Sequence, residues 1–243
     1  MRSDEFIKTI LKTTDEQVLG SLRNDIPLGL DVVDKVALAK NGIGGVAFNH
    51  TCVAGVKRTE FIRRLLITLS CLYGKDEACF FVVSPKEEYG ELLKLNNIDV
   101  TVPYIRTKAD LESVKDTLLQ LLLLREGMAG CPKLFFVVDG IEKLEDCNRN
   151  GDLEEYREFS DALLHKKDVE FITGVDLTAS IFNGAPGAFV GIGNCLVATK
   201  EEGKADLSYV NMDVTLSQPL LIRFPSEPSM TETIVFLNSL DKE

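Results

Sequence analysis

The sequence has few of the residues that build metal sites. It contains only two histidines, His50 and His165, and none of its six cysteines stands in the C-x-x-C spacing typical of zinc sites. Most of the cysteines lie within or beside apolar runs. We therefore expect reduced core cysteines, as in a cytosolic protein, and no zinc site.

Excess positive charge and long apolar runs are also missing. Lys and Arg number 27 against 38 Asp and Glu, a formal net charge of −11, which opposes attraction to nucleic acid or to an anionic membrane. The longest aliphatic cluster, residues 118–124, is far short of the roughly 20 residues that a membrane helix needs. Residues 1–5 carry acids where a signal peptide carries bases. These absences predict a cytoplasmic protein that does not bind nucleic acid.

Apolar runs typical of buried strands alternate with segments of helical periodicity. The predicted strands cover residues 26–31, 36–39, 50–54, 78–83, 100–105, 133–139, 168–173 and 219–224. One helix is predicted from the turn after residue 55 to about residue 73, and others are predicted at 87–95, 109–125, 153–165 and 230–240. This alternation predicts one α/β domain over residues 1–243. Its sheet is mostly parallel with helices on both faces, and residues 1–24 form a helical lead-in.

Residues 46–66 have the pattern of a strand, a turn and a helix that binds phosphate in P-loop proteins. There the turn carries G-x-x-x-x-G-K-[ST], whose backbone N–H groups surround phosphate oxygens. Counting from Gly55 puts Glu60 at the second Gly, Phe61 at the Lys and Ile62 at the Mg²⁺-binding hydroxyl. The order of strand, turn and helix is kept, but the residues that bind phosphate and Mg²⁺ are lost. The candidate nucleotide-binding residues are Gly55, Val56, Lys57, Arg58, Thr59, Glu60 and Phe61.

Asp139 ends the most apolar predicted strand and is followed by Gly140. In a parallel sheet the carboxyl ends of the strands meet at one edge, so Asp139 is expected beside the loop after Ala54. This position suits an Asp that orients Mg²⁺. It equally suits an Asp that makes a turn or capping hydrogen bond with no metal.

Five segments, in order, resemble the FtsK/SpoIIIE (HerA-type) P-loop ATPase domains, which include the tandem ATPase modules of type VII secretion proteins. They are P-L-G-L-D at 27–31, H-T-C-V-A-G at 50–55, F-V-V-S-P-K at 81–86, the strand at 134–139 and F-I-T-G at 171–174. The resemblance implies a RecA-like P-loop NTPase fold with Asp139 as the Walker B residue. It also implies partners among other ATPase modules or subunits of a secretion or translocation complex, and among substrate signal segments. A membrane would be reached only through such a complex.

The departures from this family fall on the chemistry. Hydrolysis needs a Lys, Mg²⁺ and a residue that positions water, but Phe61, Ile62 and Gly140 stand at those places, and Gly174 and Val175 replace a polar pair. We therefore expect a catalytically degenerate domain that acts as a binding or regulatory module without a cofactor. Two alternatives stay open. One is a motor ATPase that binds ATP and Mg²⁺ through Lys57 and Asp139, and the other is a DNA translocase.

Overall fold

The computed structural model describes residues 25–30, 36–40, 50–55, 57–85, 87–144, 154–163, 166–175, 192–198, 204–208 and 220–223, with residues 231, 232, 234, 235 and 238. The predicted lead-in at residues 1–24 lies outside these residues.

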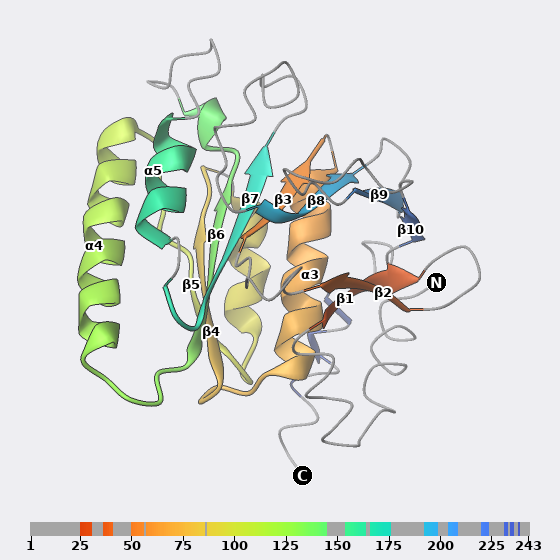
Figure 1. Cartoon of the computed structure of the whole chain (residues 1–243), viewed down its shortest axis with the longest axis horizontal. Coiled ribbons are helices and arrows are strands. Elements are labelled where there is room, and N and C mark those ends of the chain that lie inside the picture. The colour runs from red at the N-terminus through yellow and green to blue at the C-terminus, as the bar shows by residue number, and fades with distance from the viewer. Residues whose placement is uncertain are drawn as a thin grey trace.

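Strands and helices alternate through the central part of the chain (Figure 1). The strands are β1 (Asp25–Leu30), β2 (Val36–Lys40), β3 (His50–Ala54), β4 (Ala78–Val83), β5 (Asp99–Thr101), β6 (Lys133–Asp139), β7 (Val169–Val175), β8 (Ile192–Ala198), β9 (Lys204–Ser208) and β10 (Leu220–Arg223). The α-helices are α3 (Arg58–Leu72), α4 (Lys108–Glu126) and α5 (Glu154–Leu163), and the 3₁₀ helices are η1 (Glu87–Lys94) and η2 (Ile141–Lys143).

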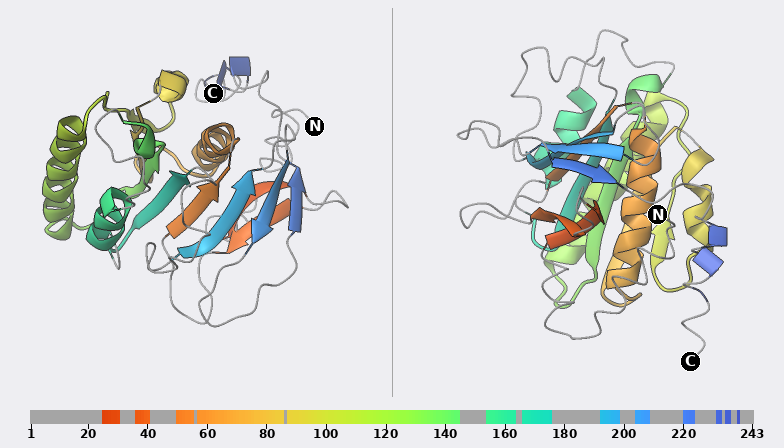
Figure 2. Two further views of the ribbon diagram at one scale, coloured as in Figure 1. Left: turned by 90° about the horizontal axis from the view of Figure 1, so that it is seen from above. Right: turned by 90° about the vertical axis from the view of Figure 1, so that its right-hand side faces the viewer.

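The described strands form one ten-stranded sheet in the order β2-β1-β10-β9-β8-β3-β7-β6-β4-β5. Parallel pairing runs from β8 through β3, β7, β6 and β4 to β5. The strands from β8 through β9, β10 and β1 to β2 pair antiparallel. The predicted parallel central sheet is therefore confirmed, and it carries an antiparallel extension on one side (Figure 2).

Each face of the parallel sheet has its own hydrophobic core, because successive side chains of a strand point to opposite faces. In β6, Phe135 and Val137 pack with residues of α3 on one face. Phe136 and Val138 pack with residues of α4 and α5 on the other face. Helices therefore cover both faces, as the sequence predicts, and β6 is buried on both sides.

Some local predictions differ from the structure. The strand expected at 100–105 is shorter, because Pro103 has no backbone N–H to donate to a ladder. Pairing resumes beyond it only as a single bridge between Ser84 and Tyr104. The helix predicted at 87–95 is a 3₁₀ helix over residues 87–94, and β9 was not predicted because its sequence is mostly polar. Among the described residues, no helix is long and apolar enough to cross a membrane.

Candidate functional site

The sheet brings the ends of β3 and β6 to the same edge. Only β7 lies between these two strands. Gly174 of β7 is level with Val53 on one side and with Asp139 on the other. The structure thus places Asp139 beside the loop after Ala54, where the parallel-sheet argument expects it.

The connection from β3 to α3 is short. Gly55 has a φ of 108°, which favours glycine, and its backbone N–H donates to the Val175 carbonyl oxygen at 3.1 Å. Only Val56 and Lys57 follow before α3 begins at Arg58. The backbone N–H of Arg58 donates to the Gly55 carbonyl oxygen at 3.2 Å. The turn is therefore closed by its own backbone hydrogen bonds.

This early helix start changes which residues stand beside Asp139. Counting from Gly55 assumed a loop of full length and placed Phe61 and Ile62 at the Lys and hydroxyl positions. In the structure both side chains are buried in the core between α3 and the sheet. Arg58 and Thr59 occupy the first turn of α3 instead. The structure therefore places Arg58 and Thr59, and not Phe61 and Ile62, in contact with Asp139.

Asp139 is fully buried and accepts three side-chain hydrogen bonds. Arg58 Nε donates to Oδ1 at 2.7 Å. Thr59 Oγ1 donates to Oδ2 at 2.6 Å, and the Tyr89 hydroxyl donates to the same oxygen at 2.9 Å. Arg58 is 2% exposed, so its ion pair with Asp139 is a buried one. We call these four residues the Asp139 network.

Two glycines leave the space that the Asp139 network fills. A Cβ on Gly174 would lie 2.2 Å from Oδ1 of Asp139 and 2.7 Å from Cδ1 of Ile62. Gly140 has a φ of 77°, and a Cβ there would lie 3.3 Å from Nη2 of Arg58. These are two of the positions at which the sequence departs from the resembled ATPases. Their missing side chains make room for the carboxylate and the guanidinium.

The electrostatics of the network favour a neutral phenol and a paired charge. Burial raises the pKa of Tyr89 well above its ordinary value, and the adjacent Asp139 charge raises it further. Tyr89 therefore keeps its proton and acts as a hydrogen-bond donor. The negative charge of Asp139 is balanced by Arg58 and solvated by two hydroxyl groups.

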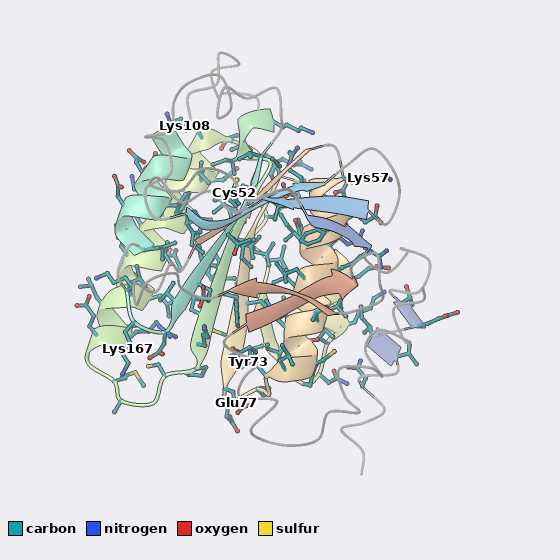
Figure 3. The ribbon with its side chains drawn as sticks, turned by 45° about the vertical axis from the view of Figure 1, so that its right-hand side comes forward. Cys52, Lys57, Tyr73, Glu77, Lys108 and Lys167 are labelled. Carbon is teal, nitrogen blue, oxygen red and sulfur yellow. The ribbon has the colours of Figure 1, made fainter. Side chains whose placement is uncertain are left out.

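Two further candidate residues of the loop, Lys57 and Glu60, contact each other. Lys57 Nζ lies 3.4 Å from Glu60 Oε2, and Arg64 Nε lies 3.5 Å from Glu60 Oε1. Figure 3 shows Lys57 at the start of α3 and Tyr73 at its far end. The loop cation is thus paired with Glu60 of its own helix.

A Mg²⁺ ion in a P-loop site is held by the hydroxyl that follows the loop Lys and by the Walker B Asp. Thr59 and Asp139 could supply these oxygens, but the Arg58 guanidinium contacts Oδ1 of the same carboxylate. A divalent cation there would meet a fixed positive charge at close range. The residues present therefore do not fit a bound Mg²⁺. In the described part of the chain, no cluster of three or more His, Cys, Asp or Glu could hold a metal elsewhere.

Comparisons with solved structures identify the fold. The cytoplasmic domain of the type VII secretion ATPase EccC from Thermomonospora curvata has a TM-score of 0.64 at 12% identity, covering 89% of this chain and 31% of that one. EccC ATPases 2 and 3 from the same organism, in complex with a signal sequence peptide, have a TM-score of 0.56 at 14% identity, covering 84% of this chain and 41% of that one.

A third similar structure is the pCW3 conjugation coupling protein TcpA with ATPgS, with a TM-score of 0.53 at 14% identity, covering 94% of this chain and 73% of that one. Neither a protein-family model nor a curated protein matches the sequence. The chain spans less than half the length of the two EccC chains. Identities this low show the fold alone, and the chain therefore has the α/β fold seen in the EccC ATPase domains and in the coupling protein TcpA.

Proposed function

We propose that this chain is a nucleotide-independent ATPase-like module that serves a secretion or translocation machine by binding or regulating its other parts. The observation that carries the proposal is the buried contact of Arg58 with Asp139. In a P-loop ATPase the equivalent carboxylate helps to hold Mg²⁺. Here the Arg58 guanidinium of the protein itself binds that carboxylate.

The energy of the pair decides against tight nucleotide binding. Mg²⁺·ATP could reach Asp139 only after the Arg58 guanidinium had left it. Removing one partner of a buried ion pair costs about 3–5 kcal/mol, which is the upper limit here because Mg²⁺ would replace the lost positive charge. At about 1.4 kcal/mol per tenfold change, such a cost weakens nucleotide affinity by at most several thousand-fold. Hydrolysis would also lack an acidic residue after Asp139, since Gly140 stands there.

The role in a larger machine is supported by the fold comparisons. The solved EccC chains are more than twice as long as the part that matches this chain, so their domains of this fold sit among other domains. We therefore propose that the partners are other ATPase modules or subunits of a cytoplasmic assembly, with a membrane reached only through it. Signal segments of substrates are a further partner class, since EccC was solved with a signal sequence peptide.

The alternatives receive no support from the described contacts. An unconventional motor ATPase would use Lys57 on the phosphates, but Lys57 is paired with Glu60. A DNA translocase would have to bind a polyanion with a net charge of −11.

The proposal is tested by thermal unfolding with and without Mg²⁺·ATP, together with an assay of phosphate release. We expect no rise in Tm, because a ligand stabilises only the fold that it binds. We also expect background phosphate release from the wild type, from Lys57→Ala and from Asp139→Asn alike. A rise of several degrees at low ATP concentration, with phosphate release that Asp139→Asn abolishes, would overturn the proposal.

A further inference from the structure

The outer side of α4 carries a group of exposed apolar side chains. Leu119 is 40% exposed, Leu123 69% and Leu124 67%, and Met128 just beyond the helix is 65% exposed. We call these four residues the α4 apolar patch. Figures 1 and 2 show α4 at the outer margin of the described fold, with no other element over its outer side. Several large apolar side chains exposed on one short segment are typical of an interaction site.

The fold of α4 does not require the patch. The inward side of the helix already supplies Leu111, Val114, Leu118 and Leu122 to the core. The helix start is fixed by a capping box, in which the Thr107 hydroxyl accepts from the Asp110 backbone and the Asp110 side chain accepts from Thr107. The segment after the helix is held by Arg125, whose Nη2 donates to the Pro132 carbonyl oxygen at 2.6 Å. The outward leucines are therefore available for a partner.

The same side of α4 is acidic in its first half, because Glu112 and Asp116 lie at helical spacing from Leu119 and Leu123 and are exposed. The neighbouring cation Lys115 makes its short contact with Glu158, at 2.5 Å, and reaches Glu112 only at 4.0 Å. The outer side of α4 thus runs from an acidic half to an apolar half.

We propose that this side of α4 binds an amphipathic helix of a partner protein. Apolar side chains of the partner would pack on the α4 apolar patch, and Lys or Arg side chains would lie beside Glu112 and Asp116. The inference rests on the proposed role as a binding module and names a surface for it. That surface belongs to the helix that covers the face of the sheet opposite α3.

Charge argues against two other occupants. If two copies of this chain paired through antiparallel α4 helices, the leucines of one copy would face Glu112 and Asp116 of the other. A parallel pair would place acid against acid, which is unfavourable. An anionic membrane surface would be repelled by the same two carboxylates and by the net charge of −11.

The test uses three synthetic helical peptides of the same length as α4 and the full chain. The first has a leucine row in one half and lysines in the other, the second has glutamates in place of the lysines, and the third has the composition of the first without its periodicity. We expect fluorescence anisotropy to show binding of the first peptide, with at least tenfold weaker binding of the other two. Absence of binding, or equal binding of the three peptides, would overturn the proposal.

Variants assign the binding to α4. Leu123→Ser with Leu124→Ser should weaken binding of the lysine peptide at least tenfold, and Glu112→Lys with Asp116→Lys should transfer the preference to the glutamate peptide. Leu93→Ser is the matched control, because Leu93 is 56% exposed on η1 and should leave binding unchanged. Circular dichroism checks that each variant is folded.

Light scattering and vesicle sedimentation test the other occupants. If the wild type is a dimer and the variant Leu123→Ser with Leu124→Ser is a monomer, the occupant is a second copy and the proposal is overturned. If the wild type sediments with anionic vesicles and the same variant does not, the occupant is a membrane and the proposal is likewise overturned. Stabilisation by Mg²⁺·ATP alongside peptide binding would refute nucleotide independence and leave the α4 surface standing. If Mg²⁺·ATP gives no stabilisation and the peptide does not bind, only the proposal for the α4 surface is refuted.

Discussion

A methyl group on Gly174 would lie 2.2 Å from Oδ1 of Asp139, although the two residues belong to different strands. Gly174 and Asp139 are paired neighbours on adjacent strands, and the lack of a side chain at Gly174 leaves room for the carboxylate. The side of Asp139 that faces β7 has no room for any side chain. The position of the buried carboxylate thus depends on the absence of atoms at Gly174 as much as on its three donors.

Gly174→Ala is expected to destabilise the fold more than the same change at two other glycines. Forcing a methyl group into a filled core costs about 1–3 kcal/mol. Gly140→Ala should cost about 1–2 kcal/mol through its left-handed backbone, since its contact with Arg58 is only mildly short. Gly90→Ala is the control, because nothing lies within 4 Å of a Cβ there. Urea unfolding of the three variants gives the order, and an equal loss from all three would contradict the steric argument.

The Arg58–Asp139 pair should behave as one unit in a double-mutant cycle. Asp139→Asn and Arg58→Met each leave one buried charge without its partner and should each cost about 3–5 kcal/mol. The double variant should lose much less than the sum, because neither charge then remains. Free energies of unfolding from urea titrations measure the coupling. Additive losses would show that Arg58 is not balancing Asp139.

Tyr89→Phe removes one donor to Asp139 and leaves the ring in place. A hydrogen bond to a charged group contributes about 1.5–3 kcal/mol, so we expect a loss of that size in the free energy of unfolding. Tyr104→Phe is the control, since Tyr104 is 58% exposed. An unchanged stability of Tyr89→Phe would mean that water or another group replaces the phenol.

An ion pair between the buried Glu170 and the partly exposed Lys133 gives a pH-dependent prediction. Lys133 Nζ lies 2.8 Å from Glu170 Oε1. Burial raises the pKa of Glu170, and the Lys133 charge opposes that rise. Lys133→Met removes the opposing charge, so the pKa of Glu170 should rise further and the variant should lose about 3–5 kcal/mol near neutral pH.

The sign of the pH effect follows from the raised pKa. Between its unfolded value of about 4.3 and its folded value, Glu170 binds more protons in the folded chain than in the unfolded chain. Stability therefore falls as pH rises through this range, and Lys133→Met should regain part of its loss when pH is lowered from 7 to 5. Urea unfolding at both pH values measures this, with Lys75→Met as the control because its pair with Asp99 is exposed. A pH dependence equal to that of the wild type would contradict the prediction.

The strands were predictable where burial leaves a plain pattern in the sequence. β3, β4, β6 and β7 are covered on both faces, so each is a mostly apolar run, and their parallel arrangement put Asp139 at the correct edge. The rim of the sheet was harder, because β9 is polar and β5 is cut short by Pro103.

The site was predictable only in part. The count from Gly55 could not show how many residues separate strand from helix, so it set Phe61 and Ile62 at the first turn of the helix, where the structure has Arg58 and Thr59. Nothing in the local pattern of η1 indicates that Tyr89 reaches Asp139, since that contact spans 50 positions of the chain. The sequence showed that Gly140 and Gly174 depart from the pattern of the resembled ATPases. It could not show that the two glycines leave room for the side chains of Arg58 and Asp139.

The early start of α3 places a cation at the positive end of the helix macrodipole, which is unfavourable for Arg58 by itself. Lys57 at the N-cap makes no side-chain cap hydrogen bond. Negative charge at this end of the helix comes from Glu60 in the first turn and from Asp139. Asp139 lies on β6, and β7 separates β6 from β3, the strand that precedes α3. Asp139 thus places a negative charge beside the first turn of α3 and binds the side chains of Arg58 and Thr59 there. Where an ATPase would place a phosphate at this helix end, the chain uses its own carboxylate as the anion.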